Sequence, residues 1–352
     1  MSSDQEPRRQ LSRRTIVLAA AVAAVLVIAG VTALAWPREN EPTPHAAPNS
    51  SNEPSDNPLN GVKFYVDPDG HAPEQVRRWQ GEGQTADATA LRRIADQPVA
   101  KWLGNADAAG EAETAAKAAE SSGRHALLVA YYIPHRDCGQ YSSGGAENAA
   151  AYRDWIAKLA KGLAAHAATV ILEPDAIPHT LDGCLDAEET AERYALLNEA
   201  VATLTANPDV AVYVDAGHAS WIKDTSKLAQ ALTKVGIAKA DGFALNVSNF
   251  ETTSANTSYG KAISDHLDGM HFVIDTSRNG NGPYQDGDSD LRWCNPPGRA
   301  LGSAPTTDTG IDRVDAFLWV KQPGDSDGSC RDGAPAAGQW WADYALKLAK
   351  TN

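Results

Sequence analysis

Positive charge is scarce in this 352-residue chain, which has 31 Lys and Arg residues against 45 Asp and Glu residues and a formal net charge of -14. Proteins that follow a phosphate backbone usually present a basic face, so the composition argues against nucleic acid as a partner. An acidic protein also repels acidic polymers. The charge balance therefore favours a neutral substrate.

Motifs for phosphate, metal and nucleophilic serine chemistry are also missing. No glycine-rich phosphate loop follows the first predicted strand, and we find neither a serine elbow nor a zinc-binding helix motif. The stretch 286–290 has alternating aspartates, but it lacks the Gly at the sixth position and the Glu at the twelfth position of a calcium loop. We therefore expect neither a metal nor a cofactor.

Phenylalanine is rare, with five residues against nine Trp and ten Tyr. Trp and Tyr combine a flat apolar face with a polar group, and this combination suits sugar rings. Most of these side chains are expected in the core, but the excess favours a carbohydrate partner.

The N-terminus resembles an export signal. Arg8, Arg9, Arg13 and Arg14 precede an uncharged run at 15–35, and Arg13-Arg14 suits a twin-arginine signal. Residues 1–36 are therefore predicted to be a signal peptide or a signal-anchor transmembrane segment. Cleavage and retention both remain open, so the protein is expected to be secreted or tethered to the outer face of the membrane through residues 15–35.

Residues 37–58 are rich in Pro, Asn, Ser and Glu and offer little to bury, so they are predicted to be a disordered linker. A single catalytic domain is predicted over 59–352. Continuous apolar runs at 62–66, 126–132, 169–173, 210–215, 242–247, 271–275 and 316–320 suit strands buried on both faces. Helical patterns at 107–121, 147–166, 187–206, 225–239 and 258–268 lie between them. This alternation predicts a distorted parallel α/β barrel with about seven strands.

Acidic residues lie at the ends of five of the seven predicted strands. They are Asp137, Asp175, Asp215, Asp275, Asp325 and Asp327. Because the carboxyl ends of barrel strands meet at one mouth, we expect these side chains to converge there. Crowded carboxylates raise the pKa of one member, and glycosidic cleavage needs one protonated and one ionised carboxyl group. The pattern favours this chemistry over a calcium site.

The four cysteines follow neighbouring strands in two pairs. Cys138 and Cys184 lie beyond the second and third predicted strands, and Cys294 and Cys330 lie beyond the sixth and seventh. Neighbouring loops are close enough to be joined, so 138–184 and 294–330 are favoured among the three connectivities.

Ordered motifs now point to a family. They are Asn57-Pro-Leu-Asn-Gly with Tyr65-Val-Asp-Pro, Gln97-Pro-Val-Ala-Lys-Trp102, Arg136-Asp-Cys138 with Ser142-Ser-Gly-Gly145, Glu173-Pro-Asp175, Asp215-Ala-Gly-His218, Asp275-Thr-Ser-Arg-Asn-Gly-Asn-Gly282, Trp293-Cys294 and Lys321-Gln-Pro-Gly324 with Asp327-Gly328. From about residue 58 to 350 the chain resembles glycoside hydrolase family 6, the secreted bacterial cellulases.

This resemblance implies inverting hydrolysis of β-1,4-glucan. Asp175 matches the general acid, Asp137 matches the carboxylate that raises its pKa, and Asp327 matches the proposed base. Ser143 matches a hydroxyl that holds a water molecule. Asp215 matches a carboxylate that supports the site and binds sugar, and Tyr131 matches a tyrosine that crowds the sugar at the cleavage point. The resemblance implies stacking platforms at Trp102, Trp221 and Trp293, and polar sugar contacts at His218, Asn246, Lys321 and Asp325.

Endo attack is expected because the loops after the third and seventh strands are short, although the exo mode of the same family remains open. Two further alternatives are a non-catalytic glucan-binding protein on the cell surface and an enzyme for another envelope glucan. Asp325 stands where the family usually has Glu, and Tyr132 stands where a smaller polar residue is common. Both departures affect chain preference more than catalysis. A monomer is expected.

Overall fold

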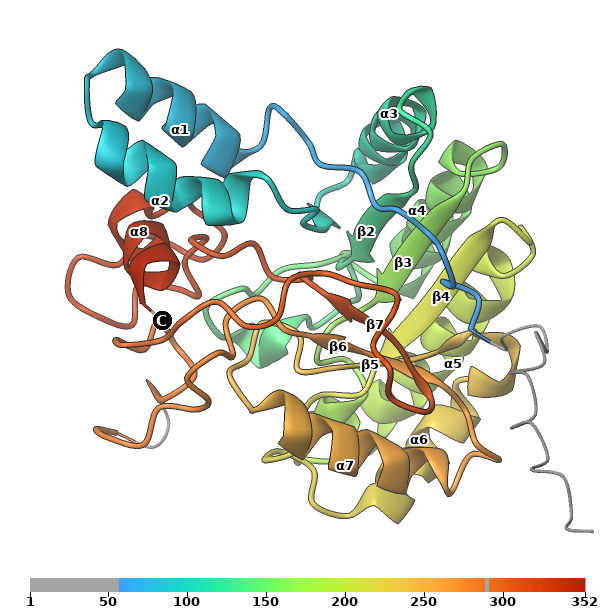
Figure 1. Cartoon of the computed structure of the whole chain (residues 1–352). Coiled ribbons are helices and arrows are strands. Elements are labelled where there is room, and N and C mark those ends of the chain that lie inside the picture. Colours follow the sequence, from blue (N-terminus) through green and yellow to red (C-terminus); the bar gives the residue numbers. More distant parts are fainter. Residues whose placement is uncertain (1–56, 289–290, 352) are drawn as a thin grey trace, which may run out of the picture. The chain divides into compact units, whose positions relative to one another are not determined.

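The computed structural model describes residues 57–288 and 291–351, and Figure 1 shows their arrangement. The predicted signal or anchor segment and nearly all of the predicted linker lie outside the described residues, so both stay predictions. None of the helices in the described part of the chain is long and apolar enough to cross a bilayer.

Seven parallel strands form one sheet in chain order. They are β1 (Lys101–Leu103), β2 (Ala126–Ala130), β3 (Ala168–Leu172), β4 (Val210–Asp215), β5 (Gly242–Leu245), β6 (Phe272–Asp275) and β7 (Val314–Leu318). All residues of β2, β3, β5, β6 and β7 are buried, because helices cover one face and the barrel interior covers the other. The predicted α/β barrel of seven strands is confirmed.

Two hydrogen bonds connect the segment around the first edge strand, β1, to the residues that follow the other edge strand, β7. The backbone N–H of Ala100 donates to the carbonyl of Trp319 at 3.0 Å, and the indole N–H of Trp102 donates to the carbonyl of Val320 at 2.8 Å. No ladder pairs β1 with β7 in the described sheet. The barrel is therefore distorted at this seam, where loops rather than strands complete the ring.

The first predicted strand is wrong. Within 62–66 only Phe64 forms a bridge, to His125, whereas the regular edge strand is β1 at Lys101–Leu103. His125 immediately precedes β2, so the earlier segment reaches only the beginning of the sheet. Residues 101–103 instead pair with residues 128–130.

The described residues contain eight α-helices. They are α1 (His71–Gly81), α2 (Thr85–Ala95), α3 (Ala108–Ser121), α4 (Ala149–Gly162), α5 (Ala187–Leu204), α6 (Thr225–Lys234), α7 (Thr253–Ser264) and α8 (Ala342–Lys350), with short 3-10 turns η1 (Asp137–Gly139), η2 (Pro178–Thr180) and η3 (Ile237–Lys239). Helices α3 to α7 alternate with strands as predicted. Helix α7 begins earlier than expected because the Thr252 hydroxyl caps it by accepting from Ala255 N–H.

Helices α1 and α2 were not predicted. They pack with α8 in a separate group away from the helices that cover the sheet (Figure 1). Val76, Leu91, Leu348 and Trp319 belong to their shared core. Trp319 is 2% exposed, which confirms its prediction as a core residue and fixes this helical group to the seam beside β7.

Candidate active site

Asp175 and Asp215 are close neighbours at the carboxyl ends of β3 and β4. The backbone N–H of Asp175 donates to Oδ1 of Asp215 at 2.9 Å, and the N–H of Gly217 donates to the same oxygen at 3.0 Å. Asp215 is 1% exposed, and its Oδ2 has no hydrogen-bond partner within the described residues. One oxygen of this carboxyl group is therefore free to interact with a proton or a ligand.

These two carboxyl groups resist ionisation. Burial raises the pKa of Asp175 well above its usual value, and the charges of Asp215 and Asp137 raise it further. Burial also raises the pKa of Asp215 to about 7. Because neighbouring carboxyl groups titrate together, the pair of Asp175 and Asp215 retains a proton near neutral pH. Retention of a proton at this pH is the property that a general acid needs.

Asp137 lies in the loop after β2, where Ser142 connects it to Tyr131. Oδ2 of Asp137 accepts from the backbone N–H and the hydroxyl of Ser142 at 2.7 and 2.8 Å, and the Ser142 hydroxyl lies 3.0 Å from that of Tyr131. The Arg136 guanidinium donates to the carbonyl of Tyr131 at 2.6 Å and lies 4.5 Å from its ring centroid. Ser142 was not predicted. Ser143, which was predicted, is exposed beside it, and its role stays a prediction.

The backbone is strained where these acidic residues lie. Asp137, Cys138, Glu173, Asp175 and Asn246 have φ values of 54°, 48°, 49°, 69° and 66°. The left-handed region is unfavourable for residues with a Cβ, so the surrounding structure must hold these conformations in place. Such strain concentrates at ligand and catalytic sites, which supports a functional mouth at this end of the barrel.

A buried scaffold holds the loops after β2 and β3. The Glu173 carboxylate accepts from the backbone N–H groups of Tyr132 and Ile133 at 3.0 and 3.1 Å, and burial raises the pKa of Glu173 to about 7. Arg193 on α5 donates to the carbonyls of Pro134 and His135 at 2.8 and 3.1 Å. Glu173 belongs to a recognised motif, whereas nothing in the sequence indicated Arg193.

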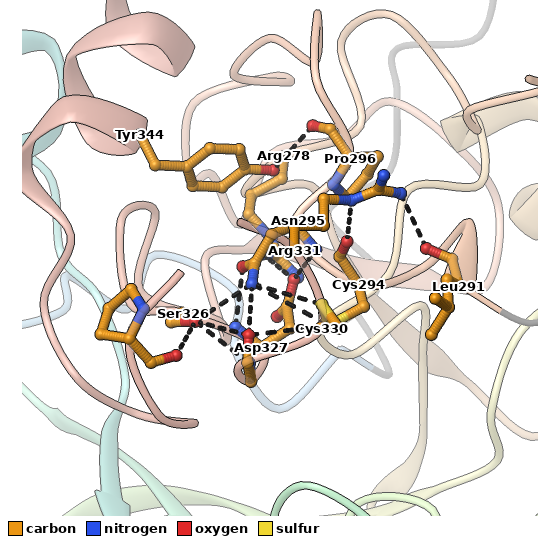
Figure 2. Close-up of a disulfide and its surroundings, with 12 residues drawn as sticks. Arg278, Leu291, Cys294, Asn295, Pro296, Ser326, Asp327, Cys330, Arg331 and Tyr344 are labelled. Atoms are coloured by element: carbon orange, nitrogen blue, oxygen red, sulfur yellow. Dashed lines mark hydrogen bonds and ion pairs between the residues drawn. A yellow bond between two sulfur atoms is a disulfide. The ribbon is translucent and has the colours of Figure 1, made fainter. Parts of the chain in front are cut away.

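Asp327 occupies the opposite electrostatic environment (Figure 2). Its Oδ2 accepts from Arg278 at 2.8 Å and from the backbone N–H of Asn295 at 2.9 Å, while Lys321 lies 3.3 Å from Oδ1. Burial would raise the pKa of Asp327, but Arg278 and Lys321 outweigh it and hold the pKa below its usual value. Asp327 is therefore a carboxylate that stays ionised.

Both predicted disulfides are confirmed. Cys138–Cys184 and Cys294–Cys330 have Cα–Cα separations of 6.2 and 6.3 Å. The second disulfide adjoins Asn295, whose amide donates to the carbonyl of Gly328 at 2.8 Å (Figure 2). In the chain-entropy model each disulfide stabilises the fold by about 4 kcal/mol. The two disulfides brace the loops that hold Asp137 and Asp327.

The loops that bear Asp137 and Asp327 touch through a glycine. A Cβ built at Gly328 would lie 2.7 Å from the side chain of Tyr141, and Gly328 has a φ of +144°. The Tyr141 ring also meets that of Trp293 at a centroid separation of 5.9 Å. The structure therefore brings the two loops together at the barrel mouth, and a larger residue at position 328 would push them apart.

The predicted platforms Trp102 and Trp221 are both partly buried. Trp102 meets Tyr131 edge-on at 5.1 Å, and Trp221 meets the rings of His179 and His218 at 4.9 and 5.7 Å. Burial, with a smaller effect from Lys223, lowers the pKa of His218 to about 4, so its ring is neutral near neutral pH. Trp293 is also partly buried.

Asn246 and Asp275 hydrogen-bond to backbone groups of the loops around the site. Asn246 is fully buried, and its amide donates to the carbonyl of Asp275 at 2.8 Å, so its contact with sugar stays a prediction. Oδ2 of Asp275 accepts from the backbone N–H groups of Ser248 and Lys321, each at 3.0 Å. Asp275 therefore ties the loops after β5 and β7 together.

Asp325 contacts the helical group formed by α1, α2 and α8. Its Oδ1 lies 3.0 Å from Nδ1 of His71, the first residue of α1, and the His71 ring lies 5.8 Å from that of Trp340. The hydrogen bond to Asp325 is the main cause that raises the pKa of His71. No sequence pattern indicates this pair, because the partners are far apart along the chain.

Comparisons with known proteins agree with this geometry. The profile of the family described as Glycosyl hydrolases family 6 matches residues 59–352. Endoglucanase A of Cellulomonas fimi is 44% identical over 291 residues, which are 82% of this chain and 61% of that protein. Endoglucanase 1 of Streptomyces halstedii is 41% identical over 295 residues, or 81% of this chain and 88% of that protein.

A solved structure is also similar to this chain. It is the endoglucanase Cel6 from Mycobacterium tuberculosis in complex with methyl-cellobiosyl-4-deoxy-4-thio-β-D-cellobioside. The TM-score is 0.78 at 45% identity, with 83% of this chain and 98% of that chain covered. The chain spans about three fifths of the Cellulomonas protein but nearly all of this structure.

Proposed function

Because the chain belongs to glycosyl hydrolases family 6, we propose that it cleaves β-1,4-glucosidic bonds inside cellulose or a related β-glucan. The opposite protonation states of two carboxyl groups carry this proposal. The pKa of Asp175 is raised by burial and neighbouring charge, whereas the pKa of Asp327 is held low by Arg278 and Lys321. Glycosidic cleavage requires one carboxyl group of each kind. The names of the similar endoglucanases support the substrate class.

In the proposed mechanism Asp175 donates its proton to the leaving glycosidic oxygen. The charges of Asp137 and Asp215 keep that proton in place until the bond begins to break. Tyr131 crowds the sugar at the cleavage point, and Ser143 holds a water molecule of the proton chain. A general acid of this kind contributes about 10²- to 10⁴-fold to the rate.

Asp327 is the proposed base, and it acts on the attacking water directly or through a second water. A direct role requires an ionised carboxylate, and its contacts with Arg278 and Lys321 supply one. Attack from the face opposite the leaving group inverts the anomeric centre. NMR of the first products from a β-linked substrate is therefore expected to show the α anomer, and early β anomer would contradict the mechanism.

Sugar rings are proposed to stack on Trp102, Trp221 and Trp293, which are partly buried and so keep part of their surface open. Lys321, His218 and Asp325 are proposed to hold hydroxyl groups, and a neutral His218 can both donate and accept a hydrogen bond. Asn246 is predicted to hold a sugar hydroxyl group, and in the unliganded fold its buried amide donates to the carbonyl of Asp275. The net charge of -14 favours a neutral natural substrate.

Endo attack follows from the short loops around the mouth. The loop after β3 reaches α5 at Ala187, and the segment after Asp327 is tied at Cys330. Loops this short have little reach to roof the bound chain into a tunnel. The two loops touch where Gly328 lies against Tyr141.

Viscosity of carboxymethyl cellulose, followed together with the reducing ends released, tests the proposed function. Endo cleavage lowers viscosity steeply for few new ends. Cellobiose as nearly the sole early product, with viscosity almost unchanged, would favour exo attack. Binding without any reducing ends would instead favour a glucan-binding protein. Asp175→Asn is the matched control, because it retains the shape of the site.

We propose further that the protein acts outside the cytoplasm. Its two disulfides support an oxidising compartment, as do the basic residues and apolar run near the N-terminus. Fractionation of cells that express the full chain tests this: mature protein in the medium indicates cleavage, and protein on the membrane indicates a tether. Activity confined to the cytoplasm would contradict the proposal.

A further inference from the structure

His179 lies beside the Cys138–Cys184 disulfide in the loop after β3. One ring nitrogen of His179 and the two cysteine sulfurs all lie within 4.8 Å of one another. The histidine is 5% exposed, whereas Cys138 is partly buried and Cys184 is exposed, so a reductant can reach the disulfide from the surface. The proposed hydrolysis makes no use of the cluster.

The hydrogen bonding of His179 leaves one nitrogen unused. Its Nδ1 lies 2.9 Å from Oδ2 of Asp182, whereas Nε2 is buried without a hydrogen-bond partner among the described residues. A carboxylate on Nδ1 holds the proton there and leaves the lone pair of Nε2 available to a ligand. Histidines that bind metals are oriented by a carboxylate in this way. A buried nitrogen with no partner is otherwise costly.

We propose that reduction of the Cys138–Cys184 disulfide creates a site for a thiophilic divalent cation such as Zn²⁺, bound by both sulfurs and His179. A phosphine or thiol reductant supplies two electrons and the sulfurs take up two protons, which the metal then displaces. Two thiolates and one imidazole form a familiar zinc ligand set, and a water completes the tetrahedron. Asp182 serves as the carboxylate behind the histidine.

The distances suit such a site. Zinc bonds of about 2.3 Å to sulfur and about 2.0 Å to nitrogen place tetrahedral ligand atoms roughly 3.5–3.8 Å apart. The three ligand atoms already lie within 4.8 Å of one another, and the two Cα atoms are 6.2 Å apart. Opening the disulfide separates the sulfurs toward the zinc spacing without a large movement of the backbone.

The metal would replace the disulfide as the link between the loops after β2 and β3. The backbone N–H of His179 donates to the carbonyl of Asp175 at 3.1 Å, and the His179 ring packs edge-on against Trp221 with the ring centroids 4.9 Å apart. A cation on His179 would therefore hold the Asp175 loop in the reduced protein. This inference concerns metal binding and stability, so it can fail while the proposed hydrolysis stands, and the reverse also holds.

The test uses the whole protein, reduced with tris(carboxyethyl)phosphine and titrated with Co²⁺ and then Zn²⁺. We expect a sulfur-to-cobalt absorption band, about one metal ion per chain, and a higher thermal midpoint with Zn²⁺. Asp182→Asn is expected to weaken binding by about 10- to 100-fold, the usual effect of removing the carboxylate behind a ligand histidine. His179→Gln is expected to weaken binding further.

The second disulfide provides the matched control, because no metal-binding cluster forms around it in the described part of the chain. The double variant Cys294→Ser/Cys330→Ser is expected to keep the band and the stabilisation by Zn²⁺, and Cys138→Ser/Cys184→Ser is expected to lose both. Equal binding by the oxidised protein, or no stabilisation of the reduced wild type by Zn²⁺, would overturn the proposal. Thermal midpoints report on every variant, including those that fold only with metal.

Discussion

The ion pair between Arg278 and Asp327 sets the protonation state of the proposed base. Arg278 is 0% exposed and donates to Asp327 at 2.8 Å. Arg278→Met keeps much of the side-chain length but removes the charge, whereas Arg278→Lys keeps a charge in the same place. Comparison of the two variants separates the electrostatic effect from the loss of packing.

The expected shift follows from the contacts. A cation against a carboxylate lowers its pKa by about 1–3 units. Lys321 remains 3.3 Å from Asp327 in the variant, so we expect the pKa of Asp327 to rise by about 1–2 units in Arg278→Met. Breaking a buried ion pair costs about 3–5 kcal/mol of unfolding free energy, because an uncompensated charge remains.

The stability difference depends on pH with a defined sign. In the wild type the folded pKa of Asp327 is depressed, so its contribution is present above the unfolded value of about 3.9 and is lost as pH falls through the folded value. In Arg278→Met that contribution shrinks or reverses. The gap between the unfolding free energies of wild type and variant therefore widens as pH rises from the depressed folded pKa of Asp327 in the wild type to the higher folded pKa in the variant, and it stays constant above that pH.

The pH profile of kcat/KM on soluble β-glucan measures the catalytic effect. We expect the acidic limb of Arg278→Met to move upward by about 1–2 pH units, because the base must be ionised, and that of Arg278→Lys to move little. Near-ultraviolet circular dichroism shows that each variant is folded. An unmoved acidic limb in a folded Arg278→Met enzyme would refute Asp327 as the titrating base.

Other predictions concern the acid, the loop contact and the rim. Asp175→Asn should lose about 10²-fold or more of the activity on polysaccharide but less on an aryl glycoside whose leaving group needs no proton, and near-full polysaccharide activity would rule out this acid. Gly328→Ala should lower kcat by about 10-fold, because the added Cβ clashes with Tyr141. Adding Tyr141→Ala should restore part of the lost kcat, and an equal loss in the single and double variants would contradict the clash. His71→Gln should raise KM more than it lowers kcat. Adding Asp325→Asn to this variant should have no further effect, and additive effects of the two substitutions would refute the pairing.

The convergence of Asp175 and Asp215 was predictable because parallel strands place their carboxyl ends at one edge. Once the βα alternation was recognised, residues 40 positions apart had to meet, and they do so through a hydrogen bond of 2.9 Å. The disulfide partners followed from the same topology, since neighbouring strands have neighbouring loops. Topology of this kind is encoded in the order of apolar runs, which a single sequence displays.

Edge elements were harder to predict for a physical reason. β1 has only three residues, and Lys101 is exposed, so no continuous apolar run marks it. The run at 62–66 looks more like a strand, yet it meets only the beginning of β2. At the seam, loop hydrogen bonds from Ala100 and Trp102 replace strand pairing, and such bonds leave no periodic signal.

Charge partners decide what each carboxyl group can do, and the sequence does not show them. Asp175 and Asp327 look alike in the chain, because each follows a strand and lies near a cysteine. Burial and the charges of three other carboxyl groups act on the first, while Arg278, 49 positions away, contacts the second. The pKa of one carboxyl group is thereby raised and that of the other lowered. The acid and the base therefore differ by their long-range contacts, so the three-dimensional structure is needed to tell them apart on physical grounds.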